Sequence, residues 1–140
     1  MSEILVNKLT GTSTAGSILV TGEGNSTTTN LQQGLAKAWA HVASAFGSLP
    51  DSFNISSIDD DGTGEFGLNF TNAMGSTNYS AHMTVTFNHS STNNTRTGVI
   101  EEKKASSVEV DSGYTAASNA YFTPYDFESN GSVTVFGDLA

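Results

Sequence analysis

The chain has 140 residues, a formal net charge of −9 at pH 7 and no cysteine. This length suits one domain, or one small domain with an additional arm. The negative charge argues against nucleic acid and anionic membranes as partners, because both bind clustered lysine and arginine. The absence of cysteine excludes disulfides, thiolate zinc sites and cysteine nucleophiles.

The sequence shows no sign of membrane insertion or export. No stretch approaches the roughly 18 apolar residues that a membrane-spanning helix requires. The first residues, MSEILVNKLTG, lack the charged start and apolar core of a signal peptide. We therefore expect a mature protein that begins near Met1 and is made in a cytoplasm.

The composition favours β-structure. Only 36% of the residues are hydrophobic, and Ser, Thr, Asn and Gly dominate the rest. A helical bundle would be rich in Leu, Ala, Glu and Lys. Thr, Val and aromatic residues suit strands, whereas Gly, Asn and Asp suit turns. The sequence thus predicts short strands joined by many turns.

Residues 1–29 are predicted to form an N-terminal arm and linker. Two short apolar segments, ILVNKL and SILVTG, flank the turn-rich TGTSTAG, and the polar GEGNSTTTN follows. Two such strands are marginal in water on their own. We therefore expect Ile4, Val6 and Leu9 to anchor the arm on the rest of the domain, on another copy of the chain, or on a host particle.

The segment 30–47 is predicted to be an amphipathic helix, in a helical region spanning 30–50. Thr29 or Asn30 can cap its start, and Gly47 followed by Pro50 can end it. Its large apolar residues recur at helical spacing, and these are Leu31, Leu35, Trp39, Val42 and Phe46. Such a face would pack on the following domain or on symmetry copies of itself.

Residues 51–140 show the alternation of β-strands. The segment EFGLNF places Phe66, Leu68 and Phe70 on one side, and YSAHMTVTF and VTVF repeat this pattern. Pro124 interrupts YFTPY, which indicates an edge strand or a loop. Strands at about ten-residue intervals with Gly and Asn between them predict an antiparallel β-sandwich.

The segment SSIDDDGTGEFGLNF raises the question of a calcium loop. An EF-hand loop needs oxygen ligands at its first, third and fifth positions, Gly at the sixth and Glu at the twelfth. With Gly62 or Gly64 at the sixth position, the twelfth falls on Leu68 or Phe70, which are apolar. The pattern therefore favours a hairpin turn whose glycines adopt positive φ angles, although ion binding by Asp59–Asp61 stays open.

Catalytic motifs are not evident, and we expect a protein without enzymatic activity or cofactor. His82 and His89 would point to opposite faces of one continuous strand, so a shared metal is disfavoured. No nucleophile elbow, zinc-protease motif or phosphate-binding loop occurs in the sequence. A pair of carboxylates far apart in the sequence could still form an acid/base site.

A group of aromatic residues near the C-terminus suggests a binding surface. Tyr114, Tyr121 and Tyr125 lie among Asn and Asp, which is the combination that sugar recognition uses. The alternative is that these rings fill the core of the sandwich and its edges. If they bind a ligand, some of the three tyrosines should be exposed in a row.

Three segments resemble a module of bacteriophage proteins. DSFNISSIDDDGTGEFGLNFTNAMGSTNYS is similar to a module common in tail-fibre and related virion proteins of tailed bacteriophages, especially marine ones. VTVFGDLA resembles the way those proteins end, and MSEILVNKL resembles their start. The likeness covers Met1–Leu9 and 51–140 but carries no catalytic motif, and the chain lacks the long shaft of extended fibres.

The resemblance implies a structural protein located in the virion and made in the host bacterial cytoplasm. It suggests a short tail-fibre-like or head-decorating appendage, a homotrimer that attaches to capsid or tail proteins through its arm. The apolar seam of the predicted helix would then hold the subunits together. A receptor- or glycan-binding module and a hydrolase of capsule or cell wall are the alternatives.

Overall fold

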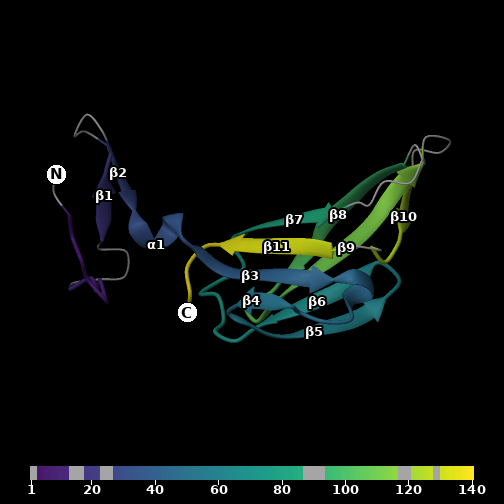
Figure 1. Ribbon diagram of the computed structural model, residues 1–140, viewed down its shortest axis with the longest axis horizontal. Coiled ribbons are helices and arrows are strands. Elements are labelled where there is room, and N and C mark those ends of the chain that lie inside the picture. Colours follow the sequence, from purple (N-terminus) through teal and green to yellow (C-terminus); the bar gives the residue numbers. More distant parts are fainter. Residues whose placement is uncertain (1–2, 13–17, 23–26, 87–93, 117–120, 128–129) are drawn as a thin grey trace. The chain divides into compact units, whose positions relative to one another are not determined.

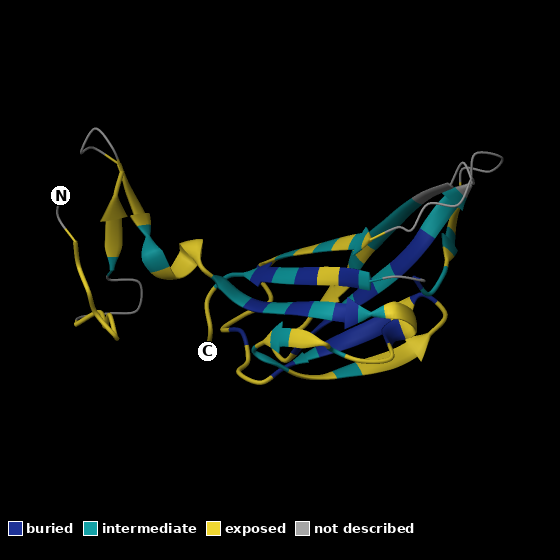
Figure 2. Ribbon diagram, in the orientation of Figure 1, coloured by how far each residue is buried: buried dark blue, intermediate teal, exposed yellow. Residues whose placement is uncertain are grey.

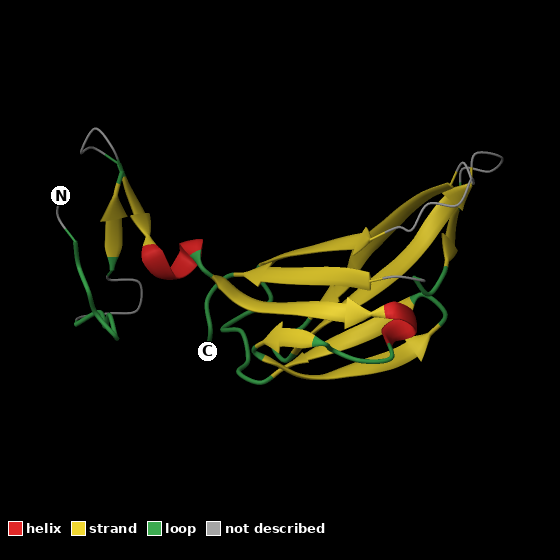
Figure 3. Cartoon of the chain, viewed as in Figure 1, coloured by secondary structure: helices red, strands yellow, loops and turns green. Residues whose placement is uncertain are grey.

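The structure, a computed structural model, describes residues 3–12, 18–22, 27–86, 94–116, 121–127 and 130–140. The chain divides into two compact units, Met1–Leu35, called here the arm unit, and Ala36–Ala140, called here the sandwich unit. Antiparallel strands dominate, and the helices are short (Figure 3). The predicted mainly β class with an antiparallel sandwich is therefore confirmed.

The arm unit contains a small hairpin and one helical turn. Strand β1 (Leu19–Thr21) pairs antiparallel with β2 (Thr28–Asn30), so part of the predicted linker is a strand. Helix α1 (Leu31–Gly34) follows directly. The side chain of Asn30 caps it as predicted, because Asn30 Oδ1 accepts hydrogen bonds from the backbone N–H of Gln32 and Gln33 at 2.8 and 3.2 Å.

The predicted helix over 30–47 is wrong beyond its first turn. Leu35 has extended backbone angles, φ −97° and ψ 139°, and Ala36–Ala43 form strand β3. A short 3₁₀ turn, Ser44–Phe46, comes after β3. The segment is therefore the first strand of the sandwich rather than an amphipathic helix preceding it, and the sandwich unit begins at Ala36 instead of Asp51.

The sandwich unit consists of two layers (Figure 1). The four-stranded sheet contains, in spatial order, β4 (Asp51–Phe53), β3, β11 (Asn130–Phe136) and β7 (Ser80–Thr86). The five-stranded sheet contains β5 (Ile55–Gly62), β6 (Glu65–Phe70), β8 (Asn94–Lys103), β9 (Ser107–Ala116) and β10 (Phe122–Pro124).

Strand β9 organises the five-stranded sheet. Strand β8 pairs with β9 along one edge, whereas β6 and β10 pair with successive parts of its other edge. Strand β5 lies outside β6. Strand β10 is three residues long and ends at Pro124, which confirms the predicted edge strand.

The chain passes from one sheet to the other at Asn54. This residue separates β4 from β5 and has a φ of 58°, a left-handed conformation that Asn tolerates better than most residues. Asn54 Oδ1 accepts hydrogen bonds from the Asn72 backbone N–H at 2.7 Å and the Asn72 side chain at 3.0 Å. The Asn54 amide donates to the carbonyl oxygen of Asn72 at 3.0 Å, so the crossing is fixed at both ends of the side chain.

Alternate residues of both sheets form the core (Figure 2). In β3, for example, Ala38, Ala40 and Val42 are buried, whereas Trp39 and His41 between them are only half-buried. The buried hydrophobic residues are Ala38, Ala40, Val42, Phe46, Phe66, Leu68, Phe70, Met74, Tyr79, Val108, Val110, Phe127, Val133 and Val135. Non-directional burial of these side chains is the main source of stability for such a fold.

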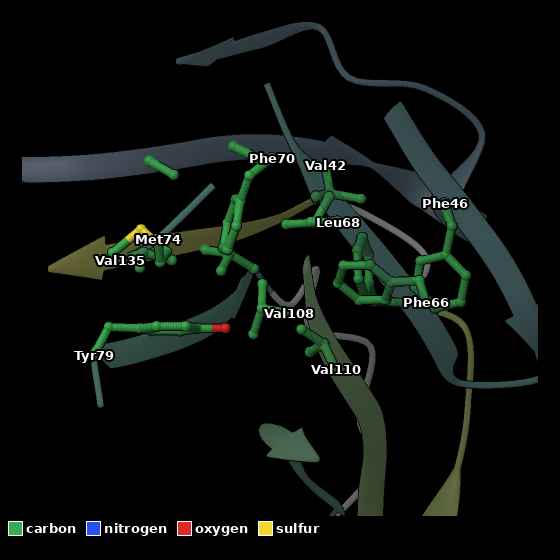
Figure 4. Packing of buried hydrophobic residues seen from close by; sticks show 14 residues of the cluster. Val42, Phe46, Phe66, Leu68, Phe70, Met74, Tyr79, Val108, Val110 and Val135 are labelled. Carbon is green, nitrogen blue, oxygen red and sulfur yellow. The ribbon is translucent and has the colours of Figure 1, made fainter. Parts of the chain in front are cut away.

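Aromatic rings pack at both ends of this core (Figure 4). The ring centroids of Phe46 and Phe66 are 4.6 Å apart, and those of Phe46 and Phe127 are 5.0 Å apart in an edge-to-face arrangement. At the other end, Phe70 and Tyr79 meet edge to face at 5.9 Å. Aromatic pairs of this kind add about 0.5–1.5 kcal/mol to the effect of area burial.

Candidate functional site

The aspartate segment forms a hairpin, as predicted. Strands β5 and β6 pair antiparallel and are joined through Thr63 and Gly64. Gly62 and Gly64 have φ angles of 143° and 81°, and Asp60 Oδ1 accepts a hydrogen bond from the Gly62 N–H at 3.2 Å. Within the described parts of the chain, no group of three or more His, Asp or Glu is arranged to hold a metal ion.

Two of these aspartates belong to a larger acidic surface on the outer face of the five-stranded sheet. Its carboxylates border a shallow hollow of about 310 Å³ and come from strands β5, β6, β8 and β9. They are Asp59, Asp61, Glu65, Glu101, Glu102 and Glu109. Gly67 lies opposite Asp59 on one side and opposite Glu109 on the other, so its missing side chain leaves room for the neighbouring carboxylates.

Lys104 partly neutralises this acidic surface. Its ammonium group lies 3.0 Å from Glu102 Oε2 and 3.1 Å from Glu109 Oε1. Glu102 and Glu109 are directly opposite in the β8–β9 pair, where like charges repel. Repulsion from Asp111, followed by partial desolvation and repulsion from Glu65, raises the pKa of Glu101 above its usual value.

The three tyrosines proposed as a ligand site do not form an exposed row. Tyr114 and Tyr125 are half-buried and meet edge to face, with their ring centroids 5.9 Å apart. The guanidinium carbon of Arg96 lies 5.0 Å from the Tyr114 centroid and 4.4 Å from the Tyr125 centroid. Tyr121 is 78% exposed. Two of the rings thus brace each other and Arg96, a partner that sequence reasoning did not identify.

A hollow lined by an aromatic ring and polar groups lies on the outer face of the four-stranded sheet. It has a volume of about 370 Å³. Its lining residues come from β3, β4 and β11 and are Trp39, Ala40, His41, Asp51, Ser132, Val133 and Thr134. The side chains of Ala40 and Val133 point into the core, so only the outward-facing side chains can contact a ligand in this hollow. The hollow is called here the Trp39 groove.

Strand register explains the arrangement of the Trp39 groove. Trp39 lies opposite Phe53 on one side and opposite Thr134 on the other. His41, two residues along, lies opposite Asp51 and Ser132. An aromatic row, formed by Trp39 and Phe53, therefore runs beside a polar row, formed by His41, Asp51 and Ser132. His82, opposite Thr134, also faces outward and its Nε2 lies 2.9 Å from Ser80 Oγ, whereas His89 lies outside the described residues.

The residues proposed for assembly fall into three different environments. Val42 and Phe46 are core residues of the sandwich unit, and Trp39 is in the groove. The remainder belong to the arm unit, where Leu31 is half-buried and the others are exposed. The exposed ones are Ile4, Val6, Leu9 and Leu35. The structure therefore does not bring the predicted helical seam together.

The structure also addresses membrane insertion in part. No helix among the described residues is long and apolar enough to cross a membrane.

Comparisons with known proteins find no matching family model, no matching curated protein and no matching solved structure.

Proposed function

We propose that this chain is a non-enzymatic structural protein of a tailed-bacteriophage virion, a short tail-fibre-like or head-decorating appendage that attaches to the particle through its N-terminal arm. The resemblance of three segments of the sequence to phage virion proteins motivates this proposal. The arm would contact capsid or tail proteins, and the sandwich unit would be the presented part. No cofactor is needed for such a role.

The exposed apolar residues of the arm carry this proposal. Ile4 and Leu5 are 85% and 83% exposed, and Val6 and Leu9 are 60% and 62% exposed. No buried residue occurs in the described part of the arm unit. Covering an apolar segment of this kind with a partner is favourable, because it lowers the free energy by about 25 cal/mol for each Å² removed from water.

Self-association, proposed here as a homotrimer, rests on the arm rather than on a helix. Val42 and Phe46 are used inside the sandwich unit and cannot contact another copy. Leu35 is 54% exposed, and Leu19 and Val20 of β1 are 58% and 50% exposed. These residues, together with the exposed apolar side chains of the segment ILVNKL, are available for contacts between arms.

The first experiment is mass spectrometry of purified particles of the phage whose genome encodes this chain. We expect its peptides in intact virions, in amounts comparable with those of other structural proteins. Their absence from virions that infect normally would contradict the proposal.

Light scattering of the purified chain then measures the oligomeric state at several concentrations, with a trimer expected for the full chain.

Matched variants test the role of the arm. We expect the triple variant Ile4→Ser, Val6→Ser, Leu9→Ser to reduce incorporation into particles and to leave the thermal unfolding of the sandwich unit unchanged. Val99→Ser is the control, because Val99 is 47% exposed but lies on the sandwich unit. Equal incorporation of both variants would show that the arm is not the attachment element.

The alternative is a receptor- or glycan-binding module that acts in host adsorption. Its predicted site at Tyr114, Tyr121 and Tyr125 is weakened by the inward packing of two of these rings. A sugar site would need a surface that offers both an accessible ring and hydrogen-bonding groups, and another face of the sandwich unit offers these.

A further inference from the structure

We propose that the Trp39 groove binds a carbohydrate, with one sugar ring stacked on the indole of Trp39 and its hydroxyls bound by the neighbouring polar row. This site differs from the tyrosines considered above. It lies entirely within the sandwich unit, so it does not depend on the proposed attachment through the arm.

The aromatic row supplies the stacking surface. Trp39 is half-buried, which holds the indole in place and leaves part of it accessible. Phe53, directly opposite on β4, is 52% exposed and extends the aromatic surface at the edge of the sheet. Such rings combine an apolar face with a fixed orientation, which suits the C–H face of a pyranose.

The polar row supplies hydrogen bonds to hydroxyl groups. Asp51 provides a carboxylate acceptor, His41 provides a ring nitrogen on either side of the imidazole, and Ser132 provides a hydroxyl that both donates and accepts. Because Trp39 and His41 are two residues apart along β3, the two rows are about 7 Å apart. A ring stacked on Trp39 can therefore direct its hydroxyls to the polar row.

The composition of the groove selects a neutral ligand that is bound and not hydrolysed. No Lys or Arg is among the described residues that line it, so a phosphate or another anion would lack a positive partner there. Asp51 is the single carboxylate among its described lining residues, whereas most glycoside hydrolases use two carboxyl groups about 5–10 Å apart. A neutral sugar fits both observations.

The sole tryptophan of the chain makes the proposal directly testable. Because Trp39 is the only Trp in the sequence, the intrinsic tryptophan fluorescence of the full chain reports on this groove alone. We would titrate the protein with glucose-, galactose-, mannose- and N-acetylglucosamine-terminated oligosaccharides. A saturable change in emission with at least one of them is the expected result.

Variants then locate the bound sugar. Asp51→Asn, His41→Ala and Ser132→Ala should each weaken the binding by about tenfold, since the first replaces a charged acceptor with a neutral amide and the other two remove a hydrogen-bonding partner of the ligand. Trp39→Phe should retain weaker binding when measured by calorimetry. Tyr121→Ala is the control and should bind as the unchanged chain does, because Tyr121 does not line the groove. Circular dichroism of each variant confirms that it folds.

Two outcomes would overturn the proposal. The first is an emission that no oligosaccharide of the panel changes, at concentrations where calorimetry also detects no binding. The second is an emission that changes with protein concentration and not with sugar, because this would make the groove a contact between copies of the chain. Binding that is lost in Tyr121→Ala but kept in Asp51→Asn would also exclude the groove as the site.

Discussion

Ser112 and Tyr125 are joined by two hydrogen bonds of opposite direction. The Ser112 hydroxyl donates to the carbonyl oxygen of Tyr125 at 2.8 Å, and the Tyr125 N–H donates to the carbonyl oxygen of Ser112 at 3.0 Å. The Ser112 N–H also donates to Gly64 O at 2.6 Å. Ser112 lies between the parts of β9 that pair with β6 and with β10, so it links the β5–β6 hairpin to the segment after β10.

Gly64→Ala should destabilise the sandwich unit by about 1–3 kcal/mol. Gly64 has a φ of 81°, and a Cβ atom there would lie 2.5 Å from Ser112 O and 2.6 Å from Tyr125 N. Both are backbone atoms of the link just described, so they cannot move cheaply. Urea unfolding measures the free energy of unfolding. Gly47→Ala is the control, because its φ is −69° and its nearest neighbour would be an ordinary contact at 3.6 Å; equal losses for the two variants would contradict the prediction.

Tyr79→Phe should lower the free energy of unfolding by about 1–2 kcal/mol. The buried Tyr79 hydroxyl lies 3.1 Å from Lys104 O and 2.9 Å from Ser107 O. It donates its proton in a hydrogen bond to these carbonyl oxygens at the β8–β9 turn. Ser107 O retains the N–H of Lys104, so the loss falls mainly on Lys104 O. The comparison is Tyr121→Phe, whose exposed hydroxyl should contribute less than about 0.5 kcal/mol. Thermal or urea unfolding of the two variants gives the difference.

The phenol of Tyr79 should ionise at a higher pH in the folded protein than in the unfolded chain. Burial, which is the largest cause, raises the pKa of Tyr79 from 10.0 to about 12. The folded protein therefore holds this proton more tightly than the unfolded chain does. The stabilisation is complete below pH 10 and is lost as the pH rises from 10 towards 12. Absorbance of tyrosinate against pH should show a step near pH 12, and this step should vanish in Tyr79→Phe; an unchanged titration curve in that variant would refute this.

Glu101→Gln should stabilise the protein at neutral pH. The pKa of Glu101 is raised by Asp111 first, then by desolvation and other carboxylates, so the ionised form is disfavoured in the folded state. For a raised carboxyl pKa, relative stability decreases as the pH rises through the unfolded value of 4.5 towards the folded value, and stays lower above it.

The measurement for Glu101→Gln is the melting temperature as a function of pH and salt. The gain over the unchanged chain should be present at pH 7, disappear below pH 4.5 and shrink in high salt, which screens exposed charges. Asp138→Asn removes one charge outside the acidic surface and should give a smaller gain. A gain for Glu101→Gln that is the same at all pH values would assign the effect to packing and not to charge.

Strand β3 should tolerate substitution on one face and not on the other. Val42→Ala is expected to cost about 2 kcal/mol, because Val42 is fully buried between the sheets. Ala43→Ser, at the next residue and on the outer face, should change the free energy of unfolding by less than about 0.5 kcal/mol. Urea unfolding of both variants measures the difference, and equal losses would contradict the packing of the two faces.

The sandwich could be predicted because its strands carry a strict alternation. Phe66, Leu68 and Phe70 all point into the core, as their spacing implied. The hairpin at Gly62 and Gly64 could also be predicted, because its requirement for positive φ is local to the glycines. These features depend on neighbours in the sequence and on one buried face.

The helix prediction failed because the segment 36–43 fits two periods at once. Alanines at positions 36, 38 and 40 have high helix propensity and also fill alternate positions of a strand. Val42 satisfied the helical spacing from Trp39 by its offset of three, yet in β3 these two side chains lie on opposite faces. Pairing with β4 and β11 decides the outcome, and that pairing is invisible in the segment itself.

The candidate surfaces could not be predicted because they arise from pairing between distant strands. His41 lies beside Asp51 and Ser132 through the register of three strands. Glu109 faces Glu102 for the same reason. The composition of each strand indicated which residues face outward, but the neighbours across the sheet depend on the order of the strands.

The pairing of β3 with β11 has a consequence for biosynthesis. β3 begins the sandwich unit at Ala36, and its partner β11 ends at Phe136, so most of the sandwich unit lies between these two paired strands in the sequence. β3 therefore cannot complete its pairing before β11 has been synthesised. Contacts so distant in sequence form slowly, so the apolar face of β3 stays uncovered for longer during folding than the face of a strand paired in a local hairpin.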